Sequence, residues 1–135
     1  MKFITFFLLL FAFLKAQNDD SLFITKLEYG KMLYENPRGI GCNSCHSNSA
    51  KGKQIVQFKH TFRGEEYLCT LYAPNIKDVS FEAFKTKVNS KRNPNKKFKD
   101  DQICEKLIYK ANIMPTYYLT QEEIESIYFY IQSLN

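Results

Sequence analysis

The sequence lacks a hydrophobic run long enough to cross a membrane, and its longest such run lies at the start. One lysine precedes an apolar run from Phe3 to Leu14, and a second lysine and the small residue Ala16 follow it. A spanning helix needs roughly 17–25 apolar residues, and this run has twelve residues. The pattern is typical of a secretory signal peptide. We therefore expect residues 1–16 to be cleaved near Ala16, and residues 17–135 to form a single exported domain.

The chain also lacks a strong charge imbalance. Its 19 Lys and Arg residues against 14 Asp and Glu give a net charge of +5, which falls to +3 without the two leader lysines. Nucleic-acid-binding domains carry a denser positive charge, so we expect no nucleic-acid partner. One segment, 91–99, concentrates positive charge and fits either a solvated loop or a patch that docks an acidic protein. Its basic residues are Lys91, Arg92, Lys96, Lys97 and Lys99.

Cysteine and histidine are scarce, with four and two residues, yet three of these six lie in the sequence Cys-Asn-Ser-Cys-His at positions 42–46. A zinc site usually takes two ligand pairs, and the chain has no second pair. A thioredoxin-like redox pair would accompany a βαβ pattern, which is absent. A disulfide across two residues would be strained and would leave His46 without a role. Covalent haem attachment uses all three residues: Cys42 and Cys45 as thioethers and His46 on the iron.

A haem iron in such a site usually takes a sixth ligand, and few residues are available for it. One methionine belongs to the leader, and Met32 lies only ten residues before Cys42. Met114 precedes a proline that restricts it to an extended or turn conformation. His60 is the alternative ligand and would make a bis-histidine site. The apolar pocket is expected to draw on Phe81, Phe84, Ile113, Tyr117 and Tyr118.

Apolar periodicity predicts a mostly helical chain. Helices are expected after residue 20 or 21, after Ser80, after Asp100 or Asp101, and after Thr120, which forms a capping box with Glu123. Residues 55–72 instead alternate apolar and polar positions on both sides of an Arg-Gly-Glu-Glu interruption, which indicates a β-hairpin. We therefore expect an all-α fold class with one inserted hairpin.

These motifs together resemble the class I monohaem cytochromes c. In that family the N-terminal helix carries a glycine and, four residues later, an aromatic residue, and Gly30 and Tyr34 match them. This helix crosses a C-terminal helix whose matching residues are Tyr130 and Ile131. Family members also have a proline whose carbonyl accepts a hydrogen bond from the axial histidine, and Pro74 is in that place. The resemblance implies crossed terminal helices around one haem.

The resemblance further implies one covalently bound haem c with His46 and Met114 as axial ligands, in an electron carrier and not an enzyme. Two strong ligands leave no open position for a substrate, and a thioether sulfur favours reduced iron. A haem enzyme or gas sensor is the alternative if the sixth ligand is labile. Another is a haem subunit of a periplasmic dehydrogenase complex. The expected partners are a periplasmic oxidase, peroxidase, cytochrome bc1-type donor or dehydrogenase, so that the protein meets the membrane only through partners.

Two cysteines, Cys69 and Cys104, are left over after haem attachment. An exported chain passes through an oxidising compartment, and an even number of remaining cysteines favours a disulfide between them. The alternative is a pair of buried free thiols, because each cysteine falls on the apolar side of its expected element.

Overall fold

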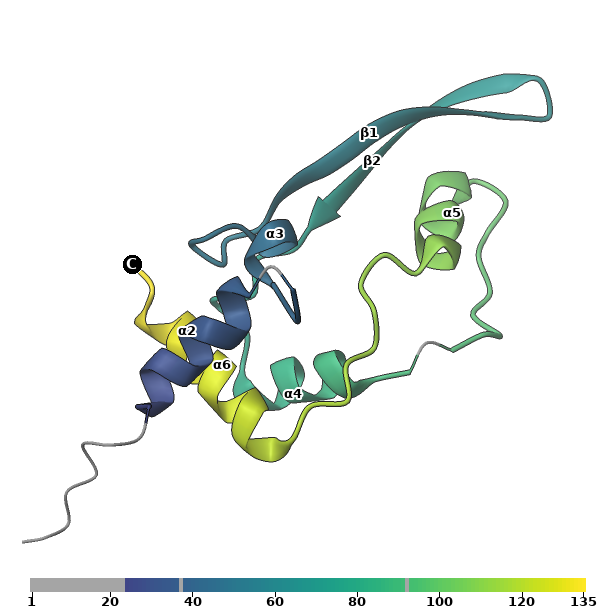
Figure 1. Cartoon of the computed structure of the whole chain (residues 1–135). Helices are drawn as coiled ribbons and strands as arrows, with labels where there is room; N and C mark the ends of the chain where they lie inside the picture. Colours follow the sequence, from purple (N-terminus) through teal and green to yellow (C-terminus); the bar gives the residue numbers. More distant parts are fainter. Residues whose placement is uncertain (1–23, 37, 92) are drawn as a thin grey trace, which may run out of the picture.

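The computed structural model describes residues 24–36, 38–91 and 93–135. The predicted signal peptide, residues 1–16, lies outside the described residues, as does Arg92 of the basic segment. Within the described ranges, no helix is long and apolar enough to cross a membrane. The elements are α2 (Lys26–Glu35), α3 (Asn43–His46), β1 (Lys53–Phe62), β2 (Glu65–Ala73), α4 (Phe81–Asn89), α5 (Ile103–Ala111) and α6 (Gln121–Ser133) (Figure 1).

The β-hairpin shows that the predicted all-α fold class is wrong, because the described chain combines helices with an antiparallel sheet. β1 and β2 pair from Lys53 opposite Ala73 up to a turn at Arg63 and Gly64. Both turn residues have positive φ, 53° and 86°, which matches the twist of paired strands. The predicted hairpin at 55–72 is confirmed, and its strands extend slightly beyond both ends. Figure 1 shows it as a long ribbon projecting away from α2 and α6.

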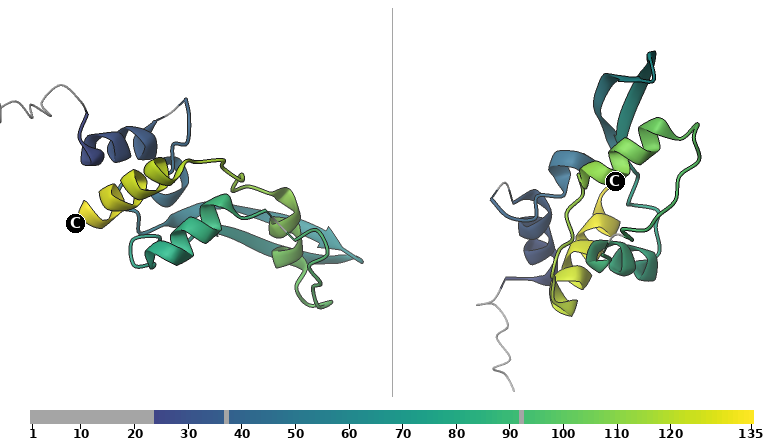
Figure 2. Two further views of the ribbon diagram at one scale, coloured as in Figure 1. Left: turned by 90° about the horizontal axis from the view of Figure 1, so that it is seen from below. Right: turned by 90° about the vertical axis from the view of Figure 1, so that its right-hand side faces the viewer.

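The contact between α2 and α6 depends on a glycine. A Cβ atom on Gly30 would lie 2.0 Å from the backbone oxygen of Ser126, so the two backbones approach too closely for a side chain there. Next to this point the rings of Tyr34 and Tyr130 stack at a tilt, with centroids 5.6 Å apart. The pairing of the first and last described helices that the resemblance implied is present (Figures 1 and 2).

Side-chain caps explain where the helices begin. Ser80 accepts a hydrogen bond at the start of α4, and Thr120 with Glu123 forms a capping box at the start of α6, as predicted. α2 begins later than predicted, behind a capping box of Thr25 and Glu28 that the sequence analysis missed. α5 begins after Gln102 and not after an aspartate, because the preceding residues form a turn in which Gln102 N donates to Lys99 O.

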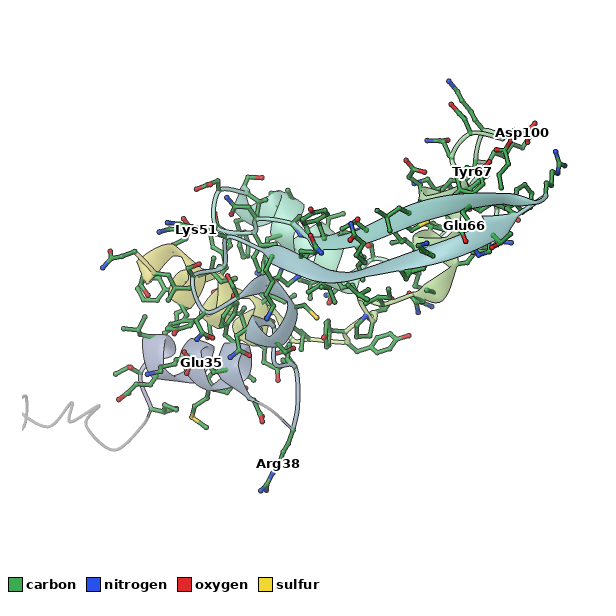
Figure 3. All side chains as sticks on the ribbon, turned by 90° about the horizontal axis from the view of Figure 1, so that it is seen from above. Glu35, Arg38, Lys51, Glu66, Tyr67 and Asp100 are labelled. Carbon is green, nitrogen blue, oxygen red and sulfur yellow. A yellow bond between two sulfur atoms is a disulfide. The ribbon has the colours of Figure 1, made fainter. Side chains whose placement is uncertain are left out.

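One hydrophobic core lies between α2, α4 and α6. Its buried residues are Tyr34, Ala50, Phe84, Val88, Ile124, Ile127, Tyr130 and Ile131. α5 lies outside this core and packs against β2 instead. Figure 3 labels Glu35 on α2 and Glu66 and Tyr67 on β2, at opposite ends of the molecule, which shows how far the hairpin extends.

A disulfide joins α5 to the hairpin. Cys69 of β2 and Cys104 of α5 are bonded, with an S–S distance of 1.92 Å and Cα atoms 5.3 Å apart. Cys69 is only 1% exposed, so this bridge is covered by the elements that it joins. The bridge therefore ties the helix that precedes Met114 to the hairpin.

Candidate functional site

The Cys-Asn-Ser-Cys-His motif forms the single helical turn α3, with Cys42 at its N-cap. The backbone N–H of His46 donates to Cys42 O at 2.8 Å, which closes the turn, and the imidazole of His46 is buried. Cys42 and Cys45 carry free, half-buried thiols. Burial raises the pKa of Cys42 to about 11, so this thiol is protonated at neutral pH.

The hairpin positions the partner of His46. Because β1 and β2 are antiparallel, the hairpin brings the chain back to its own starting point, and Pro74 lies beside Gly52. The Nδ1–H of His46 donates to Pro74 O at 2.9 Å, the hydrogen bond that the resemblance implied. With Nδ1 occupied in this way, Nε2 of the ring is left to bind a metal.

Helix α2 holds the far side of the motif. The hydroxyl of Tyr34 donates to Ser47 O at 2.6 Å, directly after the motif, and burial raises the pKa of Tyr34. Ser47 has φ 66° and ψ 166°, a backbone conformation that residues other than glycine rarely adopt. The turn that ends the motif is therefore strained and is kept in place by its contacts.

Two adjoining cavities of about 180 and 330 Å³ lie against the motif, and both are mostly apolar. They share the lining residues Ile40, Cys42, His46, Pro74, Met114 and Tyr117. The hairpin base and the end of α5 complete the smaller cavity, with Ile55, Leu71, Tyr72, Ala73 and Ile113. The core completes the larger one, with Ile76, Val79, Phe84, Val88, Leu119 and Ile127.

The structure brings Met114 to the same cavities as His46. α5 ends at Ala111, and its C-cap Asn112 has a left-handed conformation, with φ 49° and ψ 49°, just before Met114. Beyond Met114, the hydroxyl of Thr116 donates to Ser90 O at 3.2 Å, and that of Tyr117 donates to Ile40 O at the same distance. The loop is thus anchored directly after the methionine.

His60, the alternative ligand, lies elsewhere. It sits on β1 opposite Tyr67 and lines neither cavity. The zinc alternative has no ligand set in the described part of the chain, where no three His, Cys, Asp or Glu side chains form a group. Of the five residues predicted to line the pocket, Phe84, Ile113 and Tyr117 do so. Phe81 packs against Tyr128 instead, and Tyr118 is 84% exposed.

The hairpin and the loop before the motif supply lining residues that the sequence analysis missed, such as Ile40 and Leu71. The only sequence signal for Leu71 was its apolar position in an alternating strand, which indicates a buried side chain but not what it contacts. Lys87 was also missed, although its side chain lines the larger cavity.

Comparison with protein families decides what this arrangement is. The family model described as Cytochrome c matches residues 27–135, which is most of the chain. The chain belongs to the cytochrome c family. Cytochrome c domains carry a covalently bound c-type haem and transfer electrons to redox partners. Neither the comparison with curated proteins nor that with solved structures gave a significant match.

The residues of this cytochrome c fit a haem. The cavities are lined by the cysteines Cys42 and Cys45, which lie on one helical turn, and by Met114. They are also lined by His46, whose imidazole is buried and already donates its Nδ1–H. These are groups through which proteins attach and ligate a c-type haem. The apolar lining suits a flat, largely hydrophobic macrocycle and excludes water from it.

Proposed function

We propose that this chain is a periplasmic electron carrier with one haem c, attached through Cys42 and Cys45 and ligated by His46 and Met114. One observation carries the proposal: His46 and Met114, 68 positions apart in the sequence, line the same two apolar cavities as Cys42. When bound, the haem supplies one-electron redox chemistry.

The residues of the chain favour electron transfer over catalysis. Pro74 orients the imidazole of His46, and the loop anchored after Met114 keeps this residue at the same cavities. Two such ligands would leave no position for a substrate on the iron. The thioether and the apolar lining both stabilise reduced iron relative to oxidised iron, so we expect a high reduction potential.

Export of the chain is part of the proposal. Residues 1–16 would be removed as a signal peptide, and residues 17–135 would form the mature domain. The disulfide between Cys69 and Cys104 supports this location, because structural disulfides form in oxidising compartments such as the periplasm.

The proposed partners are redox proteins such as an oxidase, a peroxidase, a cytochrome bc1-type donor or a dehydrogenase. The basic segment supports docking on an acidic surface, since Lys91 and Met114 line a common cavity. This places one end of the segment next to the proposed sixth ligand. Lys96 lies over the rings of Phe98 and Tyr109, at 5.2 and 4.7 Å, and is therefore held against α5.

The absorption spectrum of the purified mature protein tests this function. We expect the reduced α-band of a c-type haem and, in the oxidised protein, a weak near-infrared band from sulfur bonded to iron. A ferrous spectrum that carbon monoxide leaves unchanged would support a six-coordinate carrier. Ready binding of carbon monoxide would instead favour the haem enzyme or gas sensor.

A further inference from the structure

Among the described residues that line the two haem cavities, Lys87 is the only lysine, and no arginine, aspartate or glutamate lines them. Lys87 is exposed and lies in the last turn of α4, next to the buried Val88. The surface around it in the larger cavity is almost entirely apolar; the other polar side chains there are His46, Asn75 and Tyr117, whose hydroxyl already donates to Ile40 O. A lone ammonium group at the edge of an apolar cavity is favourable when an anion occupies that edge.

A third cavity, of about 160 Å³, adjoins this edge. It shares Lys87 and Met114 with the larger haem cavity and adds a second cation, Lys91. Its hydroxyl groups are already engaged in hydrogen bonds to backbone oxygens: Ser90 to Lys87, Thr116 to Ser90, and Tyr109 to Asn93. Within the described part of the chain, the ammonium groups of Lys87 and Lys91 form no hydrogen bond or ion pair. These two groups are therefore available to an anion.

We propose that Lys87, assisted by Lys91, binds the propionate carboxylates of the haem and so holds the propionate edge of the macrocycle against α4. This inference rests on the proposed attachment through Cys42 and Cys45. The vinyl edge of the haem is tied to these thiols, and the propionates extend from the opposite side of the ring. The third cavity, which no cysteine lines, provides the cations for that side.

The physical reason is the cost of burying a carboxylate. A carboxylate against apolar side chains loses its hydration, and a charge-assisted hydrogen bond from an ammonium group offsets that loss. The same positive charge next to the haem disfavours ferric iron, which carries one more positive charge than ferrous iron. Lys87 is thus a positioning residue that also raises the reduction potential.

The test compares single charge removals on α4 in the full holoprotein. Lys87→Gln removes the proposed partner, and Lys85→Gln removes an equal charge two residues away, from a side chain that lines none of these cavities. Lys87→Arg keeps the charge but changes the donor geometry, and serves as the readout if Lys87→Gln yields little holoprotein. The measurements are the propionate bending band in the resonance Raman spectrum and the midpoint potential.

We expect Lys87→Gln to shift the propionate band and lower the potential, Lys87→Arg to shift the band with little change in potential, and Lys85→Gln to leave both close to wild type. A propionate band that stays in place in both Lys87 variants would overturn the assignment. Absence of covalent haem from the wild-type protein would instead disprove the proposed function, so the two failures are distinguishable.

Discussion

The imidazole Nδ1 of His46 lies 2.9 Å from the carbonyl oxygen of Pro74, although 28 positions separate the two residues. The intervening chain is almost entirely the β-hairpin, whose two ends meet where Lys53 pairs with Ala73. Gly52 makes this closure possible, since a Cβ atom there would lie 2.2 Å from Ala73 O. The hairpin thus positions the histidine and also forms a wall of the smaller haem cavity.

Replacing Met114 with alanine should keep the covalent haem but lower the reduction potential and open a coordination position, because only the soft sixth ligand is lost. The near-infrared sulfur-to-iron band of the oxidised protein should disappear, and carbon monoxide should bind the reduced protein. Met32→Ala is the control, since Met32 is 59% exposed on α2. Survival of the near-infrared band in Met114→Ala would show that another residue is the ligand.

Replacing Ser47 with glycine should raise the free energy of unfolding by about 1 kcal/mol, because the strained backbone at φ 66° suits glycine. The matched control is Ser49→Gly, which breaks the same contact between the Ser47 and Ser49 hydroxyls. Ser49 does not have a positive φ, so glycine relieves no strain there. We expect the control to be slightly destabilised. Urea unfolding of the holoproteins measures both, and a loss of stability in Ser47→Gly would argue against strain at this turn.

Removing the disulfide through Cys69→Ala and Cys104→Ala should lower the free energy of unfolding by roughly 3–4 kcal/mol on the chain-entropy model, since the bridge closes a loop of 35 positions. Because α5 leads into the Met114 loop, the variant should also weaken the near-infrared sulfur-to-iron band. Thiol titration of the unfolded wild-type holoprotein checks the bridge itself. No reactive thiol before reduction and two afterwards are expected, whereas two beforehand would refute it.

Electron transfer to an acidic partner should slow as salt rises, because screening shortens the reach of surface charge to about 8–10 Å. Reversing two charges of the basic segment that line none of the three cavities, with Lys97→Glu and Lys99→Glu, should lower the association rate more than it changes the reduction potential. Lys31→Glu on α2 is the control, because it reverses a charge outside the basic segment. Stopped-flow kinetics at low salt decide the question, and an unchanged rate in the double variant would identify the segment as a solvated loop.

Alkaline pH should destabilise the fold through Tyr130. Burial, together with a 2.6 Å hydrogen bond that Tyr130 donates to the Glu35 carboxylate, raises the pKa of the tyrosine from 10 to about 12. The fold therefore favours the neutral phenol, and this stabilisation is complete below pH 10 and is lost as pH rises toward 12.

The free energy of unfolding, measured by urea titration across that range, should fall less steeply in Tyr130→Phe than in wild type. Tyr34 remains in the variant and contributes in the same direction, because burial raises its pKa as well. Tyr118→Phe is the control, since Tyr118 is 84% exposed, and its slope should equal that of wild type. Equal slopes for Tyr130→Phe and wild type would contradict the prediction.

Local sequence patterns determined the parts of this protein that depend on backbone conformation. The alternation on both sides of Arg63 and Gly64 predicted the hairpin, and the Thr120–Glu123 box predicted the start of α6. Cys42 to His46, which the sequence identified as a haem-attachment motif, form a single helical turn. Each of these features is set by residues a few positions apart, whose periodicity and φ preferences can be read directly.

Contacts between distant segments were decided by the tertiary structure. The sequence predicted Met114 as a haem ligand and Tyr118 as a pocket residue. Only the packed structure shows that Met114 and Leu71 line the haem cavities while Tyr118 faces solvent. Lys87 looked like any charged residue of a solvated helix face until the packing of α4 placed it at the cavity edge. Such positions depend on strand register, helix rotation and close approaches such as that at Gly30, which arise only when the whole chain packs.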